Sequence, residues 1–440
     1  MKTFFALTVL LFVPMLCLGQ GRYVLKESPS EKIRFQLLNN LIVLPVELNG
    51  VKLSFLLDTG VSKPILFNIP NSETLEVKDV ETTNLQGLGG GTAVPAIKSD
   101  SNTLKIGTAV NQNQDIYVVF DETIDFTPRL GVTVHGIIGY DVFKDLVVEV
   151  NYGAKFIRFH SPETYNDKAC KKCQTLNLSL FNNKPYIQGS VKVEDSDINV
   201  KLLIDSGSSD ALWLFENELI GLQPGEQLFQ DFLGRGLSGS VYGLRSKHQS
   251  FSLGEFKFDD VNVAYPDSTT INLAKRHKGR NGSLGAGILK RFNLIFDYQK
   301  KSLQLRKNKN FGQPFRYNRS GITLQQNGLR LVKEAVLKKS IDPYQSNQGN
   351  TISFETSTKY KFDLKPSFTV VELRPDSPAD RAGIQIGDVI LNINGKSTDT
   401  MKLHDVIKHF REDVGKLIRL KIDRDGKLLE KRFRLEDIFK

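Results

Sequence analysis

Two short acidic motifs stand at the ends of apolar runs in this 440-residue chain. The first is Asp58-Thr59-Gly60 in FLLDTG, and the second is Asp205-Ser206-Gly207 in LLIDSG. Burying a carboxylate is costly unless it is hydrogen-bonded, paired or neutralised. If the two motifs meet, Asp58 and Asp205 hold one proton between them, because adjacent carboxylates cannot both ionise cheaply. Such a pair is suited to general acid–base catalysis, in which one carboxylate activates water and the other polarises a carbonyl.

Both motifs belong to an internal repeat. The block LSFLLDTGVSKPILF (53–67) recurs as VKLLIDSGSSDALWLF (200–215), and HGIIGYDVFKDLVVEVNYGAKFIRF (135–159) recurs as GSLGAGILKRFNLIFDYQKKSLQL (282–305). The two acids are 147 residues apart, and the glycines that follow the two apolar pairs are 146 apart. Motifs that stay in register over this distance indicate a duplicated unit. A pseudo-twofold axis between the halves then places Asp58 beside Asp205.

The residues after each acid suit two turns that meet closely. Gly60 and Gly207 allow a close approach and a positive φ. The hydroxyls of Thr59 and Ser206 can form hydrogen bonds across the axis and hold the turns in place. Between these landmarks the sequence alternates like short strands with Gly- and Asn-rich turns, which predicts that each half is mostly β.

Over about residues 30–310 the duplicated motif resembles the two-lobed aspartic proteases of the pepsin and retropepsin group. DSGSSDALWL matches the pepsin-like motif, whereas DTGVS departs from it at Val61, where the family usually has Ser, Thr or Ala. The resemblance implies an aspartic endopeptidase with Asp58 and Asp205 as its catalytic residues and no cofactor. It also implies that segments 137–139 and 283–285 pass behind the catalytic turns. Val61 removes a hydroxyl from the Asp58 side, which predicts two electrostatically unequal acids.

The glycine-rich stretch LQGLGGGTAVPAI (85–97) lacks the Gly-Lys-Ser/Thr ending of a phosphate-binding loop. We predict instead the tip of a β-hairpin over the cleft, a flap whose movement Gly89, Gly90 and Gly91 permit. FLGRGLSGSVYGL (232–244) lies at the matching place in the second half. The resemblance implies a flap tyrosine, and Tyr242 is the candidate.

After residue 320 the sequence changes character. Residues 350–437, and SPADRAGIQIGDVILNINGK (377–396) above all, resemble a PDZ domain in the strand order of bacterial proteases. The resemblance implies a groove that binds an extended peptide or a C-terminus by strand addition. It places Ser367, Phe368, Thr369 and Val370 on the groove strand. A packing or dimerisation module is the alternative role.

These patterns together predict a mainly β chain, with a bilobal duplicated acid-protease β-barrel fold followed by an α+β PDZ domain. The predicted bounds are 30–165 and 176–312 for the two lobes. Residues 320–440 are predicted to be the PDZ domain with its preceding linker.

The N-terminus is typical of a secretory signal peptide. Lys2 precedes an apolar run, Phe4–Leu18, which ends in Cys17-Leu18-Gly19. This predicts a signal peptide over 1–19 and export to the periplasm, the cell surface or the medium, with lipidation at Cys17 as the alternative. No later run is long and apolar enough to predict an integral membrane span.

The remaining cysteines are Cys170 and Cys173, in ACKKCQ. In an oxidising compartment they can close as a local disulfide. An active redox motif is expected next to a βαβ pattern, and the flanking residues do not show one. A zinc site needs two further ligands nearby, and the sequence does not supply them, so no metal site is predicted.

The balance of charges sets the expected partners. With 59 Lys and Arg against 49 Asp and Glu, the formal charge is +10. This modest excess favours acidic partners, but the densest basic stretch, 275–280, has no aromatic residue for base stacking. We therefore expect a polypeptide substrate and a peptide ligand of the PDZ domain, and no nucleic acid. A catalytically inactive peptide-binding scaffold on the same fold is the main alternative, and a surface adhesin has less support.

Overall fold

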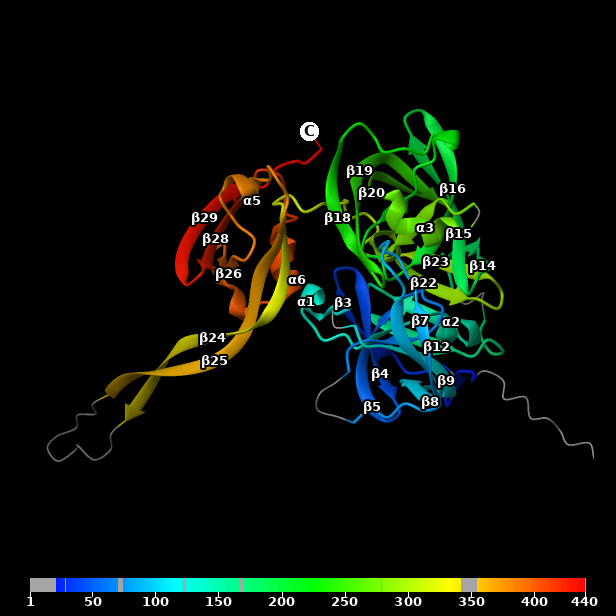
Figure 1. Cartoon of the computed structure of the whole chain (residues 1–440), viewed down its shortest axis with the longest axis horizontal. Coiled ribbons are helices and arrows are strands. Elements are labelled where there is room, and N and C mark those ends of the chain that lie inside the picture. The colour runs from blue at the N-terminus through cyan, green and yellow to red at the C-terminus, as the bar shows by residue number, and fades with distance from the viewer. Residues whose placement is uncertain are drawn as a thin grey trace, which may run out of the picture.

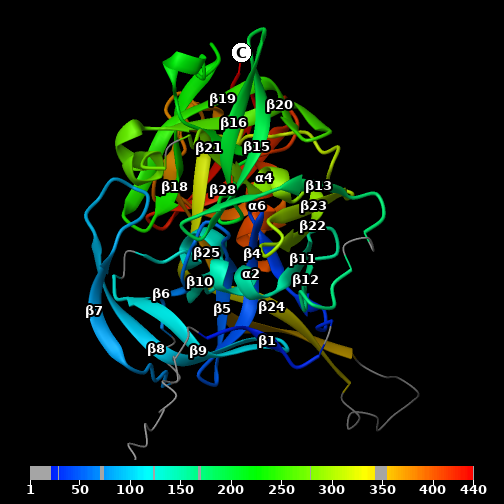
Figure 2. The same cartoon turned by 90° about the vertical axis from the view of Figure 1, so that its right-hand side faces the viewer.

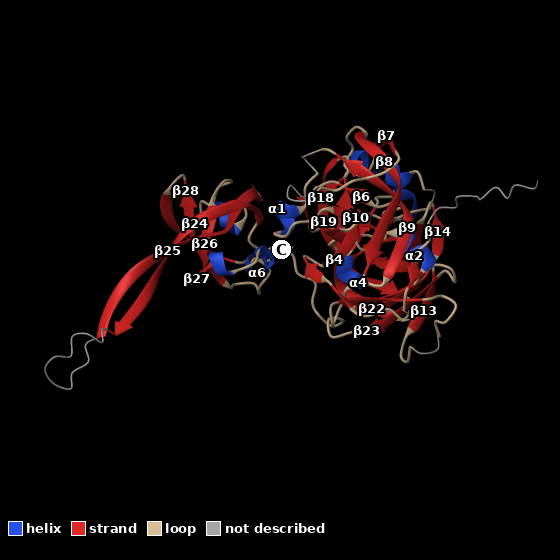
Figure 3. Ribbon diagram, turned by 90° about the horizontal axis from the view of Figure 1, so that it is seen from below, coloured by secondary structure: helices blue, strands red, loops and turns tan. Residues whose placement is uncertain are grey.

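The structure is a computed structural model that describes residues 21–27, 29–69, 74–121, 124–166, 170–277, 279–341 and 354–439. The predicted signal peptide lies outside these residues. Strands dominate the described chain, and its longest helix, α6, has seven residues. Two β lobes form one body and a smaller α+β domain lies beside it, which confirms the predicted fold class (Figures 1 and 3).

The first lobe is built on a nine-stranded sheet with the order β1-β9-β6-β10-β5-β4-β8-β7, and β3 pairs with β4. Two short helices, α1 (Thr127–Leu130) and α2 (Tyr140–Asp145), flank β10 in the sequence. The strands are β1 (Val24–Leu25), β3 (Gln36–Leu38), β4 (Leu41–Leu48), β5 (Val51–Leu57), β6 (Ile65–Leu66), β7 (Val80–Leu85), β8 (Val94–Ile106), β9 (Ala109–Val119) and β10 (Gly136–Ile138).

The second lobe repeats this plan in an eight-stranded sheet with the order β14-β15-β16-β21-β17-β20-β19-β18. Its helices are α3 (Asn272–Lys275) and α4 (Ala286–Leu289). The strands are β14 (Ser179–Phe181), β15 (Lys184–Val193), β16 (Ser196–Asp205), β17 (Leu212–Leu214), β18 (Leu228–Gly236), β19 (Gly239–Leu253), β20 (Phe256–Pro266) and β21 (Gly282–Gly285).

A third sheet joins the lobes, and β11 of the first half pairs antiparallel with β22 of the second (Figure 2). Its six strands are β2 (Ile33–Arg34), β11 (Val147–Asn151), β12 (Phe156–His160), β13 (Gln174–Asn177), β22 (Phe292–Asp297) and β23 (Ser302–Lys307). One apolar core runs through both lobes and this sheet, so burial of apolar surface holds the halves together. The predicted lobe bounds contain these strands, except β1 and the start of β13.

The C-terminal domain has its own core, which includes Phe368, Phe410 and Ile418. Its sheet has the order β24-β25-β26-β28-β29, with β27 paired to β26. The elements are β24 (Ile322–Ile341), β25 (Phe354–Leu373), α5 (Pro378–Arg381), β26 (Val389–Ile393), β27 (Lys396–Ser397), α6 (Leu403–His409), β28 (Leu417–Arg424) and β29 (Lys427–Arg434). The far halves of β24 and β25 extend from the domain as a two-stranded arm (Figure 1).

Candidate active site

Parallel strand pairing positions each aspartate. In the first half β10 pairs with β5, and the Asp58 N–H donates to the Ile138 carbonyl at 2.8 Å. In the second half β21 pairs with β16, which sets Gly285 opposite Asp205. The segments predicted to pass behind the turns do so. A Cβ at Gly139 would collide with the backbone carbonyl of Asp58, so this close approach requires glycine.

Thr59 and Ser206 bond to each other's turn in the reciprocal pattern expected for a pseudo-twofold axis. The Thr59 N–H donates to Ser206 Oγ and the Ser206 N–H donates to Thr59 Oγ1, each at 3.0 Å. The hydroxyls then donate to the carbonyls of the strands opposite, Thr59 to Ile204 at 2.6 Å and Ser206 to Leu57 at 2.8 Å. Both side chains are buried. Four hydrogen bonds thus fix the turns against each other, as predicted from the hydroxyls.

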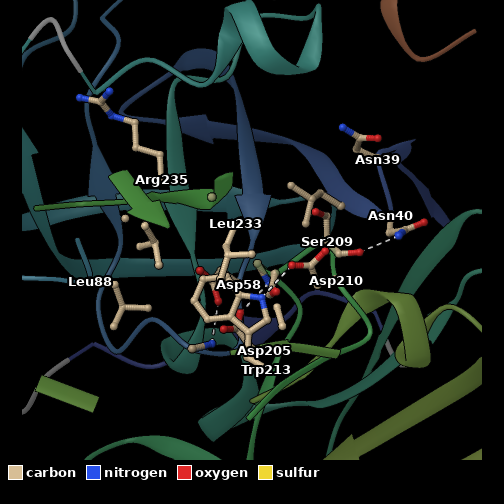
Figure 4. A pocket seen from close by; sticks show the side chains of 18 of the residues that line it. Asn39, Asn40, Asp58, Leu88, Asp205, Ser209, Asp210, Trp213, Leu233 and Arg235 are labelled. Atoms are coloured by element: carbon tan, nitrogen blue, oxygen red, sulfur yellow. Dashed lines mark hydrogen bonds between the residues drawn. The ribbon is translucent and has the colours of Figure 1, made fainter. Parts of the chain in front are cut away.

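The two carboxylates face the opposite turn. The Gly60 N–H donates to Asp58 Oδ1 at 2.7 Å, and the Gly207 N–H donates to Asp205 Oδ1 at 3.1 Å. A Cβ at Gly207 would collide with the Asp58 carboxylate, and a Cβ at Gly60 would lie 3.6 Å from the carboxyl carbon of Asp205. The structure therefore brings together the six residues predicted at this centre, and Figure 4 shows both aspartates in one part of the cavity.

Burial and mutual repulsion change the acidity of the pair. Burial raises the pKa of Asp58 to about 7, with the charge of Asp205 as the second cause. Burial also raises the pKa of Asp205, although the nearby cations Arg280 and Lys184 oppose this rise. Because the two groups are coupled, they titrate as a pair. Between mildly acidic and neutral pH, the pair can hold a single proton.

A cavity of about 1020 Å³ opens over the aspartates. Asp58 and Asp205 line it together with Leu41, Lys184 and Trp213. It continues past Tyr317 of the connecting segment to Ile322 and Arg411 of the C-terminal domain. A cavity of this size and mixed lining can accommodate several residues of an extended peptide.

Two hairpin tips meet above the cavity, one from each lobe. Ser238 on the second tip donates its N–H to the Leu88 carbonyl at 2.9 Å and accepts from the Gly91 N–H at 2.9 Å. Its hydroxyl accepts from the Gly87 N–H at 3.0 Å. Leu88 packs against Trp213 and its neighbours in the second lobe, as Figure 4 shows. The hairpin predicted over residues 85–97 is present, and it is closed against its counterpart.

The residues that were predicted to lie on the flaps over the cleft do not line the cavity. Gly89, Gly90 and Gly91 contact the second lobe, whereas the cavity is lined by the preceding residues 85–88. The prediction for Tyr242 is wrong, because its side chain is 46% exposed and does not line the cavity, although it packs on Phe232, which does. Side chains alternate along β19, so the buried neighbour of Tyr242, Val241, lines the cavity instead.

Two cations beside the aspartates were not found from the sequence. Lys184 begins β15, and Arg280 precedes β21; both line the cavity. Arg280 donates to the Gly282 carbonyl at 3.0 Å and to Ser283 Oγ at 2.8 Å, and its guanidinium lies 5.2 Å from the Phe215 ring centroid. The sequence did contain a signal: the Asn-Asn turn before Lys184 repeats the turn at 39–40 of the first half.

His135 has a structural role. Its Nδ1 accepts from the Ser54 N–H at 3.0 Å. In the second half Asn281 Oδ1 accepts from the Lys201 N–H at 2.8 Å, at the equivalent place. A histidine and an amide therefore perform the same backbone-anchoring task in the two halves.

The prediction of the PDZ groove strand is also wrong. Ser367, Phe368, Thr369 and Val370 lie within β25, which is paired with β24 on one side and with β26 on the other. Phe368 and Val370 are fully buried. A strand bonded on both sides has no open edge for an added peptide strand. In the described sheet order the outer strand is β24, which contacts α6 and α1.

The structure joins Cys170 to Cys173 in a disulfide, with their Cα atoms 5.7 Å apart. Within the described ranges, no group of three or more His, Cys, Asp or Glu side chains is placed to hold a metal ion. The helices of the described chain include none with the length and apolar character needed to cross a membrane.

Comparisons with known proteins agree with this architecture. Residues 44–142 match the family described as aspartyl protease, and residues 369–424 match the family described as PDZ domain. The chain thus carries an aspartyl protease domain and a C-terminal PDZ domain, which supports protease activity and peptide partners. Among solved structures it is similar to the aspartic proteinase from Irpex lacteus, at 13% identity and a TM-score of 0.39 over 64% of this chain and 99% of that one.

Proposed function

We propose that the protein is an exported aspartic endopeptidase in which Asp58 and Asp205 together activate water for peptide-bond hydrolysis. The observation that carries this proposal is the reciprocal bonding of Thr59 and Ser206, which sets the two carboxylates against each other's turn. Two carboxylates held in this way meet the geometric requirement for a pair that shares a proton.

The charges around the pair assign the roles. Arg280 is the strongest charge that favours the ionised form of Asp205, and Lys184 favours the ionised form of both aspartates. Burial and the charge of Asp205 nevertheless raise the pKa of Asp58 to about 7. Asp205 accepts a proton from the bound water as the water oxygen attacks the carbonyl carbon, and Asp58 donates its proton to the carbonyl oxygen. The proton now held by Asp205 then passes to the amide nitrogen, Asp58 takes a proton from a hydroxyl of the tetrahedral intermediate, and the C–N bond breaks, which leaves the pair with one proton again. Activity needs the shared proton, so it should fall as the pH rises through about 7.

The PDZ domain is proposed to recruit or regulate the substrate. Support comes from the cavity, whose lining extends from Asp58 and Asp205 to Ile322, Ile407 and Arg411 of the PDZ domain. A peptide chain that leaves the catalytic turns on this side passes directly along the domain. Export is proposed from the signal-peptide pattern of 1–19, and the Cys170–Cys173 disulfide is compatible with an oxidising compartment.

The test is cleavage of a peptide library by Asp58→Asn and Asp205→Asn chains across a range of pH. Each variant should lose about 10³-fold in kcat/KM, since each removes one half of the acid–base pair. Asp197→Asn, at an exposed position near the start of β16, is the matched control and should retain activity. A pepstatin-type inhibitor should block the wild-type chain, and circular dichroism should show that all three variants are folded.

Undiminished cleavage by either active-site variant would overturn the proposed pair. A wild-type chain that binds peptides but cleaves none of them over the pH range would favour the peptide-binding scaffold instead.

A further inference from the structure

The two lobes present equivalent turns to the cavity but different side chains. Asn39-Asn40 and Asn182-Asn183 each form a two-residue hairpin turn with positive φ. Each turn reaches the opposite lobe: Asn40 Nδ2 donates to the Ser209 carbonyl at 2.7 Å, and Ser62 Oγ donates to the Asn182 carbonyl at 3.2 Å. Ser62 and Ser209 are themselves 147 residues apart, as are the aspartates. The turns are therefore equivalent under the pseudo-twofold axis, and Figure 4 shows the first of the two bonds.

The residue that follows each turn lines the cavity. It is Leu41 in the first lobe and Lys184 in the second, paired across the turn with Leu38 and Phe181. An apolar side chain on one wall is thus matched by an ammonium group on the other.

A second position shows the same contrast. His135 and Asn281 anchor equivalent strands, so the residues before them, Val134 and Arg280, are also equivalent. Val134 is fully buried, whereas Arg280 lines the cavity. Both cations therefore belong to the second lobe, and the first lobe has aliphatic residues at the equivalent positions.

Among the described residues neither cation forms a direct salt bridge, and the carboxylates that act on them are those of the aspartate pair. In the described part of the chain, neither Lys184 nor Arg280 takes part in an ion pair, although Arg280 is held by the Gly282 carbonyl and Ser283 Oγ. Phe181 and Tyr186 flank them, and both aromatic rings pack on the His277 imidazole. The aspartate pair carries one negative charge when it holds one proton, against two positive charges on Lys184 and Arg280. A net positive charge in a partly desolvated cavity is costly to maintain without a further anionic partner.

The rest of the cavity does not supply that partner. Its lining contains twelve Lys and Arg side chains but only four Asp, and no Glu. Two of the four are Asp58 and Asp205, which share a proton, and the other two, Asp210 and Asp231, are paired with Arg245 at 2.9 and 2.6 Å. Acids outside the cavity lining form ion pairs with Lys63, Arg129 and Arg316, and the remaining cations still outnumber the acids, so the cavity attracts negatively charged groups.

We infer that Lys184 and Arg280 form a subsite, on the second-lobe wall of the cleft beside the two aspartates, that binds a carboxylate of the peptide substrate. The inference rests on the proposed function and narrows its substrate class to peptides with an acidic group near the bond that is cut. The carboxylate can come from an Asp or Glu side chain or from the C-terminus of the peptide. A charged hydrogen bond in such a site favours the acid over its amide by about tenfold or more.

The first arm of the test measures cleavage. Matched peptides carry Glu or Gln at each position around the scissile bond, and a second set carries a free or an amidated C-terminus. At a pH where Glu is ionised, the wild-type chain should cleave the acidic member of one matched pair at least about tenfold better in kcat/KM. The pair that shows this preference identifies the source of the carboxylate.

Two substitutions at Lys184 test the assignment. In Lys184→Leu, which places in the second lobe the residue that the first lobe carries, the Glu-to-Gln ratio of kcat/KM should fall towards one. In Lys184→Glu the preference should shift to peptides with Lys at that position. Lys192→Leu, on the same strand but outside the cavity, is the matched control and should keep the wild-type ratio.

The second arm measures binding of the same labelled peptides to the full-length Asp58→Asn chain by fluorescence anisotropy. Tighter binding of the acidic peptide, lost on adding Lys184→Leu, supports the subsite even if the wild-type chain cleaves nothing, in which case the proposed function alone fails. Equal cleavage and equal binding of acid and amide peptides would overturn the subsite and leave the proposed function standing. A preference that persists unchanged in Lys184→Leu and in Arg280→Gln would overturn it as well.

Discussion

The two lobes are nearly identical where the aspartates are held and different where a substrate would lie. Thr59 and Ser206 make equivalent hydrogen bonds to each other's turn and to the strand opposite, and His135 and Asn281 anchor the same backbone position. On the cavity wall, in contrast, Leu41 of the first lobe corresponds to Lys184 of the second. Backbone geometry at the axis tolerates few alternatives, whereas a side chain that projects into an open cavity can change without disturbing the fold. Under the proposed function, catalysis depends on the shared geometry and specificity depends on the asymmetry.

The largest expected effect comes from the two turn glycines, which look equivalent in the sequence. A Cβ at Gly207 would collide with the Asp58 carboxylate, whereas a Cβ at Gly60 has its closest contact at 3.1 Å, with Asp58 Oδ1. Gly207→Ala should therefore lower kcat/KM by about 100-fold or more, because a displaced catalytic group loses its alignment. Gly60→Ala should cost about tenfold or less. Steady-state kinetics of both variants on one peptide measures the two losses in kcat/KM. Equal losses would show that the two turns tolerate a side chain equally and that the lobes are symmetrical at this position.

The next effect is on stability and depends on pH. The pKa of Asp58 is raised from its ordinary 3.8 to about 7, so the folded state holds this proton more tightly than the unfolded state. Its stabilising contribution is complete below about pH 4 and is lost as the pH rises through about 7. Asn cannot ionise, so Asp58→Asn should raise the free energy of unfolding at pH 8, by on the order of 2 kcal/mol after allowance for solvent screening, and little at pH 4.

Asp205→Asn sharpens the comparison between the lobes. Arg280 and Lys184 already stabilise the ionised Asp205. Asp205→Asn should therefore raise the free energy of unfolding at pH 8 by less than Asp58→Asn does. Urea unfolding at the two pH values measures both variants. A larger gain from Asp205→Asn would contradict the assignment of the negative charge to Asp205.

The smallest effect is expected from exchanging one anchor for the other. His135→Asn gives the first lobe the side-chain type that the second lobe uses at Asn281. The free energy of unfolding should therefore change by less than about 1 kcal/mol. His135→Leu leaves the Ser54 N–H without its acceptor and should cost about 1–3 kcal/mol. Thermal unfolding of the two variants separates these outcomes. A severe loss in His135→Asn would show that the imidazole does more than accept this hydrogen bond.

The fold and the pair of aspartates could be predicted from the sequence because both depend on short sequence patterns that occur in each half. Each acid follows an apolar strand, and an apolar-apolar-Gly segment occurs about 80 residues after each acid. Parallel pairing of these segments then brings Asp58 and Asp205 to the axis. The prediction of Tyr242 on a flap was wrong because the inward or outward direction of a strand residue depends on register. One position along β19, at Val241, the side chain faces the cavity.

By itself the sequence determined that the chain is duplicated, mostly β, and equipped with two matching acidic turns and a PDZ domain, since strand patterns and turn chemistry are short-range properties. Only the tertiary structure decided which strand of the PDZ sheet lies at the edge, how the hairpin tips at Leu88 and Ser238 close on each other, and that Lys184 and Arg280 stand beside Asp205. These features arise from contacts between residues far apart in the chain. A local pattern such as the repeated Asn-Asn turn marks equivalent positions in the two halves, but it does not show what the residues there contact.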